Sequence, residues 1–235
     1  MKRISALLGL LIVAVIGTAV VVDPPLSPSA PSSFPSSSSQ SDAIPAKARA
    51  LAQLETLEVK GRAPMTGYDR KNYGPAWSDN VTVEGGRNGC DTRNDILRRD
   101  LTDITIRPGT HGCLVESGTL LDPYTGTTIN FVRGPRSGEV HIDHIVALAD
   151  SWQKGAQSWD DDTRRDFAND PRNLIAVGAS PNQQKGASDA ATWLPPNKAH
   201  RCDYAISIVD VKATYGLWVT AAEKDALHRE LLQCP

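Results

Sequence analysis

Residues 139–148, EVHIDHIVAL, place two histidines, an aspartate and a glutamate in an otherwise apolar run. Burying such groups is costly unless they are paired or bind a metal. Side chains alternate between the two faces of a strand, so Glu139, His141 and Asp143 would share one face. His144 would lie where the strand gives way to the run IVALA, a position from which it can project into a cleft.

Two segments further along the chain carry residues that could complete a site. Asn173 begins the strand-like run NLIAV, and SPNQQKG places Asn182 and Lys185 after a β-turn signal. Lys185 follows Asn182 by about one helical turn, so both side chains would lie on one face of a helix. A lone histidine most often has a structural role, but these segments favour a functional one.

These segments resemble the signatures of the HNH endonucleases, whose core is the ββα-metal (His-Me finger) fold. The matching residues are DHI from Asp143, NL from Asn173 and NQQKG from Asn182. A closer resemblance is to exported bacterial HNH proteins related to the C-terminal domain of GmrSD-type modification-dependent restriction endonucleases. It extends over most of the domain, in the blocks YDRKNYGPAWSD, CDTRNDIL, LDPYTG, HIDHIVAL, FANDPRNLIAV, NQQKG and WLPP.

The resemblance implies hydrolysis of phosphodiester bonds with the help of one divalent ion. Asp143 and the amide oxygen of Asn182 would hold the ion, and oxygen ligands suit Mg²⁺ or Mn²⁺ better than zinc. His144 would act as general base, since an ordinary histidine has a pKa of about 6.5. Asn173 would hold the loop that orients His144, and Lys185 would stabilise charge on the phosphate.

Other candidates have weaker support. His141 shares the face of Asp143 and could be a third metal ligand, could support one, or could be purely structural. Arg164 is a candidate phosphate contact, and Arg93 is a candidate for a phosphate contact or for an ion pair with Asp95. The acids of residues 160–162 are expected to complement the dipole of a helix N-terminus instead of binding a metal.

Tyr68, Arg70 and Trp77 also belong to blocks shared with the family, but no mechanism assigns them a catalytic role. Arg70 and Lys71 form one of several short basic pairs, each of which is commonly a solvated surface. The formal charge of −2 argues against a strongly basic protein that coats nucleic acid, but it allows a local basic surface.

The elements expected to position these residues define an α+β domain with a small antiparallel sheet and surrounding helices. Short strands alternate with turns between Ile104 and Ile142, and DPYTG joins two of them. Thr92 or Asn94 is expected to cap the second helix, and Thr220 with Glu223 to form a capping box at the last one. The expected helices cover residues 46–59, 92–101, 145–152, 160–168, 198–215 and 221–233.

The chain of 235 residues divides into three predicted parts. Residues 1–22 combine a basic start with a long uncharged run, which fits either a secretory signal or an uncleaved membrane anchor that contacts the membrane. Residues 23–45 are rich in Ser and Pro and are expected to be a disordered linker. Residues 46–235 are expected to form one nuclease domain, secreted or held at the cell surface.

The four cysteines favour two disulfides, because an even number in an exported chain is typically paired. Three pairings are possible. We expect Cys90 with Cys113 and Cys202 with Cys234, since each pair flanks a compact local unit. A zinc site is the alternative, although it usually requires a Cys-x-x-Cys pair, which this sequence lacks.

The sequence therefore predicts an exported endonuclease that cuts DNA, with RNA as a further candidate, and has little sequence preference. No base-reading module or protein partner is evident in the sequence. One alternative is a non-catalytic cell-surface binding or structural module that keeps the HNH fold. Another is a metal-dependent hydrolase of a different anionic substrate. The presence of Asp143, His144 and Asn182 together favours the nuclease.

Overall fold

The computed structural model describes residues 45–235. The expected signal or anchor and nearly all of the Ser/Pro-rich linker lie outside these residues. None of the helices between residues 45 and 235 is long and apolar enough to cross a membrane.

The predicted α+β class is confirmed. The helices are α1 (Ala46–Thr56), α2 (Thr92–Asp100), α3 (Leu148–Gln153), α4 (Asp161–Asn169), α5 (Ala179–Lys185), α6 (Arg201–Tyr215) and α7 (Ala221–Leu232). The strands are β1 (Thr102–Ile106), β2 (Val115–Leu121), β3 (Thr128–Val132), β4 (Val140–His144) and β5 (Leu174–Gly178). Short 3₁₀ turns are η1 (Arg70–Tyr73), η2 (Ser137–Glu139), η3 (Ala156–Ser158), η4 (Pro171–Asn173) and η5 (Lys198–His200).

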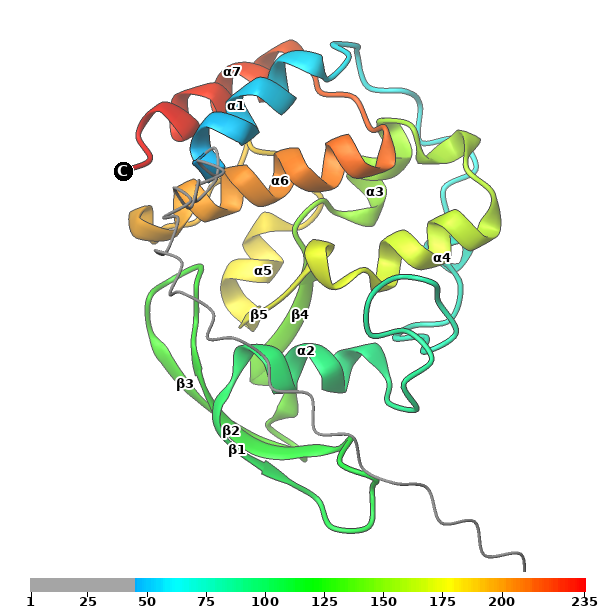
Figure 1. Cartoon of the computed structure of the whole chain (residues 1–235), viewed down its shortest axis with the longest axis vertical. Coiled ribbons are helices and arrows are strands. Elements are labelled where there is room, and N and C mark those ends of the chain that lie inside the picture. Colours follow the sequence, from blue (N-terminus) through cyan, green and yellow to red (C-terminus); the bar gives the residue numbers. More distant parts are fainter. Residues whose placement is uncertain (1–44) are drawn as a thin grey trace, which may run out of the picture. The chain divides into compact units, whose positions relative to one another are not determined.

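Two separate antiparallel sheets organise the domain. One has the order β1-β2-β3, and the other pairs β4 with β5, with His144 opposite Leu174. Helix α5 follows β5 directly and contacts both strands, which gives the predicted ββα arrangement. This unit lies between α2 with the three-stranded sheet on one side and the helices α1, α6 and α7 on the other (Figure 1).

Two apolar clusters support the ββα unit from opposite sides. The larger lies among α1, α3, α6 and α7, and the smaller lies between α2 and the strands. Helix α2 packs closely on β2 at Gly118, where an added Cβ would come within 2.9 Å of the Leu101 side chain. Helix α1 ends earlier than predicted because Leu57 adopts an extended conformation and Val59 forms a β-bridge with Val219.

The ends of the helices differ in part from the predicted caps. Helix α2 is capped by Asp91, whose carboxylate accepts a hydrogen bond from the Asn94 amide, so the predicted cap at Thr92 or Asn94 is wrong. At α7, the Thr220 hydroxyl accepts from the Glu223 amide as predicted. The Glu223 side chain does not close the capping box, because it turns inward to bind buried lysines.

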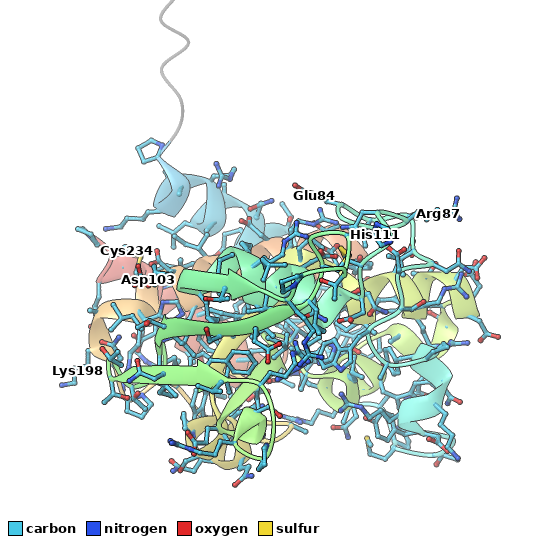
Figure 2. The ribbon with its side chains drawn as sticks, turned by 90° about the horizontal axis from the view of Figure 1, so that it is seen from below. Glu84, Arg87, Asp103, His111, Lys198 and Cys234 are labelled. Carbon is cyan, nitrogen blue, oxygen red and sulfur yellow. A yellow bond between two sulfur atoms is a disulfide. The ribbon has the colours of Figure 1, made fainter. Side chains whose placement is uncertain are left out.

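Both predicted disulfides are present. Cys90 is bonded to Cys113, and Cys202 to Cys234. The two bonds close loops in different parts of the domain. Figure 2 shows His111, which lies in the loop closed by Cys90 and Cys113, on the other side of the view from Cys234.

A buried ion cluster joins segments that are far apart in the sequence. Lys154 Nζ lies 2.6 Å from an Asp150 oxygen, 2.8 Å from an Asp189 oxygen and 2.7 Å from a Glu223 oxygen. Lys212 Nζ lies 3.3 Å from Asp150 and 3.0 Å from Glu223. Arg62 completes the cluster through a contact of 2.6 Å to Asp189, so three cations balance three carboxylates.

Candidate functional site

The alternation of side chains along β4 directs His141 and Asp143 toward α5. The Asn182 amide nitrogen lies 3.1 Å from His141 Nδ1, and Lys185 Nζ lies 2.9 Å from Asp143 Oδ2. One helical turn separates Asn182 from Lys185, and this distance matches the two-residue step from His141 to Asp143 on the strand. Four of the predicted site residues meet at this contact between β4 and α5.

Asp143 is buried and is held from two sides. Tyr124 donates a hydrogen bond of 2.6 Å to Asp143 Oδ2, the same oxygen that contacts Lys185. Burial, together with the nearby Asp143 charge, raises the pKa of Tyr124 well above its ordinary value, so its hydroxyl stays protonated and can donate. Within residues 45–235, the other oxygen, Asp143 Oδ1, accepts no hydrogen bond. One carboxylate oxygen is thus fixed and the other remains available.

Lys185 lies deeper than the sequence suggests. Its side chain is fully buried, and Nζ donates a hydrogen bond of 2.8 Å to the His144 carbonyl in addition to its contact with Asp143. A direct phosphate contact, which the sequence predicts for Lys185, does not fit this position. The reason is electrostatic: the buried Asp143 carboxylate needs a cation beside it, and Lys185 is the one that reaches it.

The His144 ring is oriented by a backbone carbonyl. His144 Nε2 lies 2.9 Å from the Ala168 oxygen, which can only accept, so Nε2 carries the proton of the neutral ring. Nδ1 is then the basic nitrogen, and it has no hydrogen-bond partner in the part of the chain that the structure describes. Burial lowers the pKa of His144 to about 4, which keeps the ring neutral at pH 7.

Asn173 holds the loop that follows His144. Its side-chain oxygen accepts a hydrogen bond of 2.8 Å from the Val146 amide, and its backbone oxygen accepts one of 2.8 Å from the Ile145 amide. Its amide nitrogen donates to the Val146 and Phe167 carbonyls, at 3.3 and 3.5 Å. Asn173 thus joins the end of β4 to the start of β5, which is the geometry that the predicted orienting role requires.

The donors between β4 and α5 suit a divalent ion. Asp143 Oδ1 and the Asn182 amide oxygen are oxygen donors, and His141 adds an imidazole nitrogen beside Asn182. Residues 45–235 contain no group of three or more His, Cys, Asp and Glu side chains placed to hold a metal, so a site here would depend on the Asn182 amide. Mg²⁺ and Mn²⁺ prefer oxygen ligands, whereas an imidazole is a more common ligand of other transition metals.

Comparison with known proteins gives the family of the chain. The model of the GmrSD restriction endonucleases, C-terminal domain, matches residues 91–230. The chain belongs to this family. It is also 37% identical over 193 residues to an uncharacterized secreted protein of the fungus Arthroderma benhamiae, covering 81% of this chain and 87% of the relative. Since that relative is fungal, similarity to this GmrSD-type domain is not confined to bacteria. No solved structure matches the chain.

Arg93 has a structural place in the GmrSD-type domain. Its guanidinium donates to the carbonyls of Ser137, at 3.4 Å, and Val140, at 3.1 Å, which fixes the segment that leads into β4. The predicted ion pair with Asp95 is absent from the described residues. Asp95 instead accepts from the Asn88 side chain.

The Arg164 side chain is likewise hydrogen-bonded within the domain. It donates to the carbonyls of Asn72 and Ala156, at 3.1 and 3.2 Å, and to that of Trp159. It also pairs with Asp161 at 2.5 Å. These bonds join α4 to the preceding loops and engage all three nitrogens of the guanidinium, so the side chain is not free to turn toward a phosphate. Asp161 lies in the first turn of α4, where the sequence predicts acids that complement the helix dipole.

A pocket of about 480 Å³ is lined in part by His144 and by no residue of α5. The Trp77 ring stacks on the His144 ring, with centroids 6.2 Å apart and planes at 12°. The sequence assigns no role to Trp77 or to Tyr124, because each contacts a site residue that is distant in the chain. Tyr124 lies 19 positions from Asp143, and Trp77 lies 67 positions from His144. The only signal in the sequence was their place in blocks shared with the GmrSD-type family.

Proposed function

We propose that this GmrSD-type domain is a metal-dependent HNH endonuclease that hydrolyses phosphodiester bonds of DNA with little sequence specificity. RNA is a second candidate substrate. The observation that carries the proposal is the state of His144. Its ring is neutral, one nitrogen is fixed by the Ala168 carbonyl, and the other is free to accept a proton.

His144 would act as the general base of the reaction. Nδ1 would accept a proton from water as the water oxygen bonds to phosphorus and the bond from phosphorus to the departing oxygen breaks. The bond from Nε2 to the Ala168 carbonyl holds the ring in place. Asn173 keeps the loop behind the ring from moving. Lys185 acts as a positioning residue, because it binds both the Asp143 carboxylate and the His144 carbonyl.

Asp143 and Asn182 would hold one divalent ion, Mg²⁺ or Mn²⁺, with His141 as the further ligand. When bound, the ion would neutralise charge on the scissile phosphate and on the departing oxygen. Tyr124 and Lys185 would prepare this site by fixing Asp143 through Oδ2, so that Oδ1 faces the ion without a change of rotamer. The arrangement supports a ligand role for Asp143 over a role in acid-base chemistry.

Export is also part of the proposal. The Arthroderma benhamiae relative is described as secreted, the chain begins with a basic start and an uncharged run, and two disulfides are characteristic of an oxidising compartment. Cleavage of the N-terminal run would release the protein, and retention would leave it anchored to the membrane. N-terminal sequencing of the mature protein decides between these two outcomes.

A plasmid-cleavage assay tests the nuclease. The chain, purified from an oxidising compartment, is incubated with supercoiled DNA and Mg²⁺ or Mn²⁺, with and without EDTA. We expect metal-dependent nicking that falls by at least about a hundredfold in His144→Ala, in line with the usual contribution of general-base catalysis. His228→Ala, which changes an exposed histidine on α7, is the matched control.

Either of two results would contradict the proposal. One is a plasmid that stays intact with every metal tried, and the other is equal cleavage by His144→Ala and the wild type. DNA binding without cleavage under all conditions would favour the alternative, a non-catalytic surface module that retains the HNH fold. Asn182→Ala adds a second test, because it should weaken Mn²⁺ binding measured by calorimetry while leaving the melting temperature nearly unchanged.

A further inference from the structure

The pocket beside His144 is formed by one short segment of the chain and the ends of two helices. Its lining includes His144 itself, so any group that fills it lies next to the proposed general base. Its volume of about 480 Å³ is within the usual range of sites that bind small molecules, roughly 300–1,000 Å³. The full lining is Asp69, Arg70, Lys71, Tyr73, Gly74, Pro75, Ala76, Trp77, His144, Leu148, Ala168 and Asn169.

The aromatic wall of this pocket is Trp77, which is partly exposed. Its backbone has φ of 58°, the left-handed region that large side chains rarely adopt. Such a conformation persists only where its surroundings impose it, and it is concentrated at functional sites. Here, the Trp77 carbonyl accepts a hydrogen bond of 3.3 Å from Thr92, which helps to hold the indole over His144.

The mouth of the pocket carries two cations without partners. Arg70 and Lys71 are exposed, and neither side chain forms an ion pair or a hydrogen bond with any residue between 45 and 235. Asp69, which also lines the pocket, is partly engaged because its carboxylate accepts from the Lys71 amide. Two free cations therefore outweigh one carboxylate, which favours an anionic ligand. Arg165, by contrast, is paired with Asp162.

Asn169 also lines the pocket, and its side chain is held by the protein itself. Asn169 is 2% exposed, and its amide nitrogen donates to the Arg165 carbonyl at 2.9 Å. Its side-chain oxygen is buried and has no partner in the described part of the chain. An unsatisfied buried acceptor costs about 1–3 kcal/mol. Because this oxygen is closed off from solvent, it is not accessible to a ligand in the pocket in this structure.

We infer that this pocket binds one unstacked nucleotide beside the scissile phosphate, so that the domain acts on single-stranded or locally unpaired nucleic acid. The inference rests on the proposed nuclease function. Two features of the pocket match two parts of a nucleotide: Trp77 offers a face for base stacking, and Arg70 with Lys71 offer positive charge for a phosphate. A base within a duplex exposes only its edges and must leave the stack to reach an aromatic wall.

Binding without metal tests the pocket separately from cleavage. The probe is a short fluorescein-labelled single strand of DNA, and its affinity for the full chain in EDTA is measured by fluorescence anisotropy beside the same sequence as a duplex. We expect the single strand to bind at least about tenfold more tightly. Trp77→Leu should weaken binding by about fivefold to a hundredfold, which corresponds to the usual contribution of one stacked base.

Arg70→Gln changes only an exposed side chain and keeps the test valid if Trp77→Leu folds poorly. It should lower affinity and reduce the salt dependence of binding by about 0.7 in slope, the value for one phosphate contact with a single strand. The matched control is Arg229→Gln, which removes an exposed charge on α7 that forms no ion pair within residues 45–235, and it should leave both affinity and slope unchanged.

The outcomes separate this inference from the nuclease proposal. Equal affinity for the single strand and the duplex, or an Arg70→Gln protein that binds as Arg229→Gln does, overturns the nucleotide pocket even if the enzyme cuts DNA through His144. Selective binding of the single strand that depends on Arg70 supports the pocket even if no metal produces cleavage. Preferential cleavage of single-stranded over duplex DNA by the wild type would support both.

Discussion

Replacing Lys154 with methionine should destabilise the domain more than any change to an exposed charge. Lys154 is fully buried, and its Nζ lies within 2.8 Å of oxygens of Asp150, Asp189 and Glu223. Methionine fills a similar volume but carries no charge. The substitution therefore leaves three buried carboxylates with only two cations, Lys212 among them.

The expected magnitude follows from the cost of an uncompensated buried charge. Removing one partner of a buried ion pair typically costs about 3–5 kcal/mol. A domain has a total stability of about 5–15 kcal/mol. For a domain of this size, each kcal/mol lowers the melting temperature by roughly 2–4 °C, so Lys154→Met should lower it by roughly 6–20 °C.

The stability that Lys154 contributes should depend on pH in a predictable direction. Burial alone would lower the pKa of Lys154, but the carboxylates of Asp150, Glu223 and Asp189 raise it above the ordinary value. The stability that Lys154 contributes is therefore complete below the pKa of an unfolded lysine and is lost only as pH rises through the higher folded pKa. Near neutral pH the whole contribution is present.

The stability contributed by Asp189 depends on pH in the opposite direction. Burial would raise its pKa, but Lys154 and Arg62 lower it below the ordinary value. Its contribution is present above the unfolded pKa and is lost as pH falls through the folded pKa. Without Lys154 the pKa of Asp189 should rise, so that protonation relieves the unpaired charge. The deficit of Lys154→Met should therefore shrink as pH falls from neutral to about 5.

Urea unfolding, followed by circular dichroism with the disulfides intact, measures both effects. Lys224→Met is the matched control, because Lys224 forms an exposed ion pair with Glu55 and should contribute less than about 1 kcal/mol. A deficit of Lys154→Met no larger than that of the control would refute the reasoning. So would a deficit that grows at lower pH.

Three further predictions concern the frame around the site. Replacing Cys202 and Cys234 together by serine should cost about 3–4 kcal/mol in the chain-entropy model, measured by urea unfolding; an unchanged midpoint would contradict this. Asn173→Ala should reduce nuclease turnover by about tenfold or more without changing metal affinity, because it frees the loop after β4; unchanged turnover would remove its orienting role. Lys185→Met should destabilise the domain by about 3–5 kcal/mol by leaving Asp143 unpaired, whereas a direct phosphate role predicts lost activity at normal stability.

The ββα unit could be predicted because its pattern is local. The alternation from His141 to Asp143, the strand from Asn173 and the single helical turn from Asn182 to Lys185 each lie within a few residues. Strand and helix periodicities then determine which side chains share a face. The disulfide pairing was also predictable, since each cysteine bonds to its nearest neighbour along the chain.

The remaining features depend on contacts between distant segments. Whether Lys185 faces a phosphate or Asp143 is decided by the depth at which α5 packs on β4, which spacing along a helix does not specify. Arg164 donates hydrogen bonds to loop carbonyls, one of them in a residue 92 positions away in the sequence. The contact of Tyr124 with Asp143 and the orphaned oxygen of Asn169 likewise arise only when separate loops close around the site.

The two disulfides have a consequence for the cell that makes the protein. Each contributes about 3–4 kcal/mol in the chain-entropy model, which together is a large share of the stability of a domain. Thiols stay reduced in the cytosol, so a chain awaiting export lacks both bonds. The fold is therefore weakest before the cysteines are oxidised and strongest once both bonds have formed. For an enzyme of the proposed activity, folding to full stability would thus be completed only in an oxidising compartment.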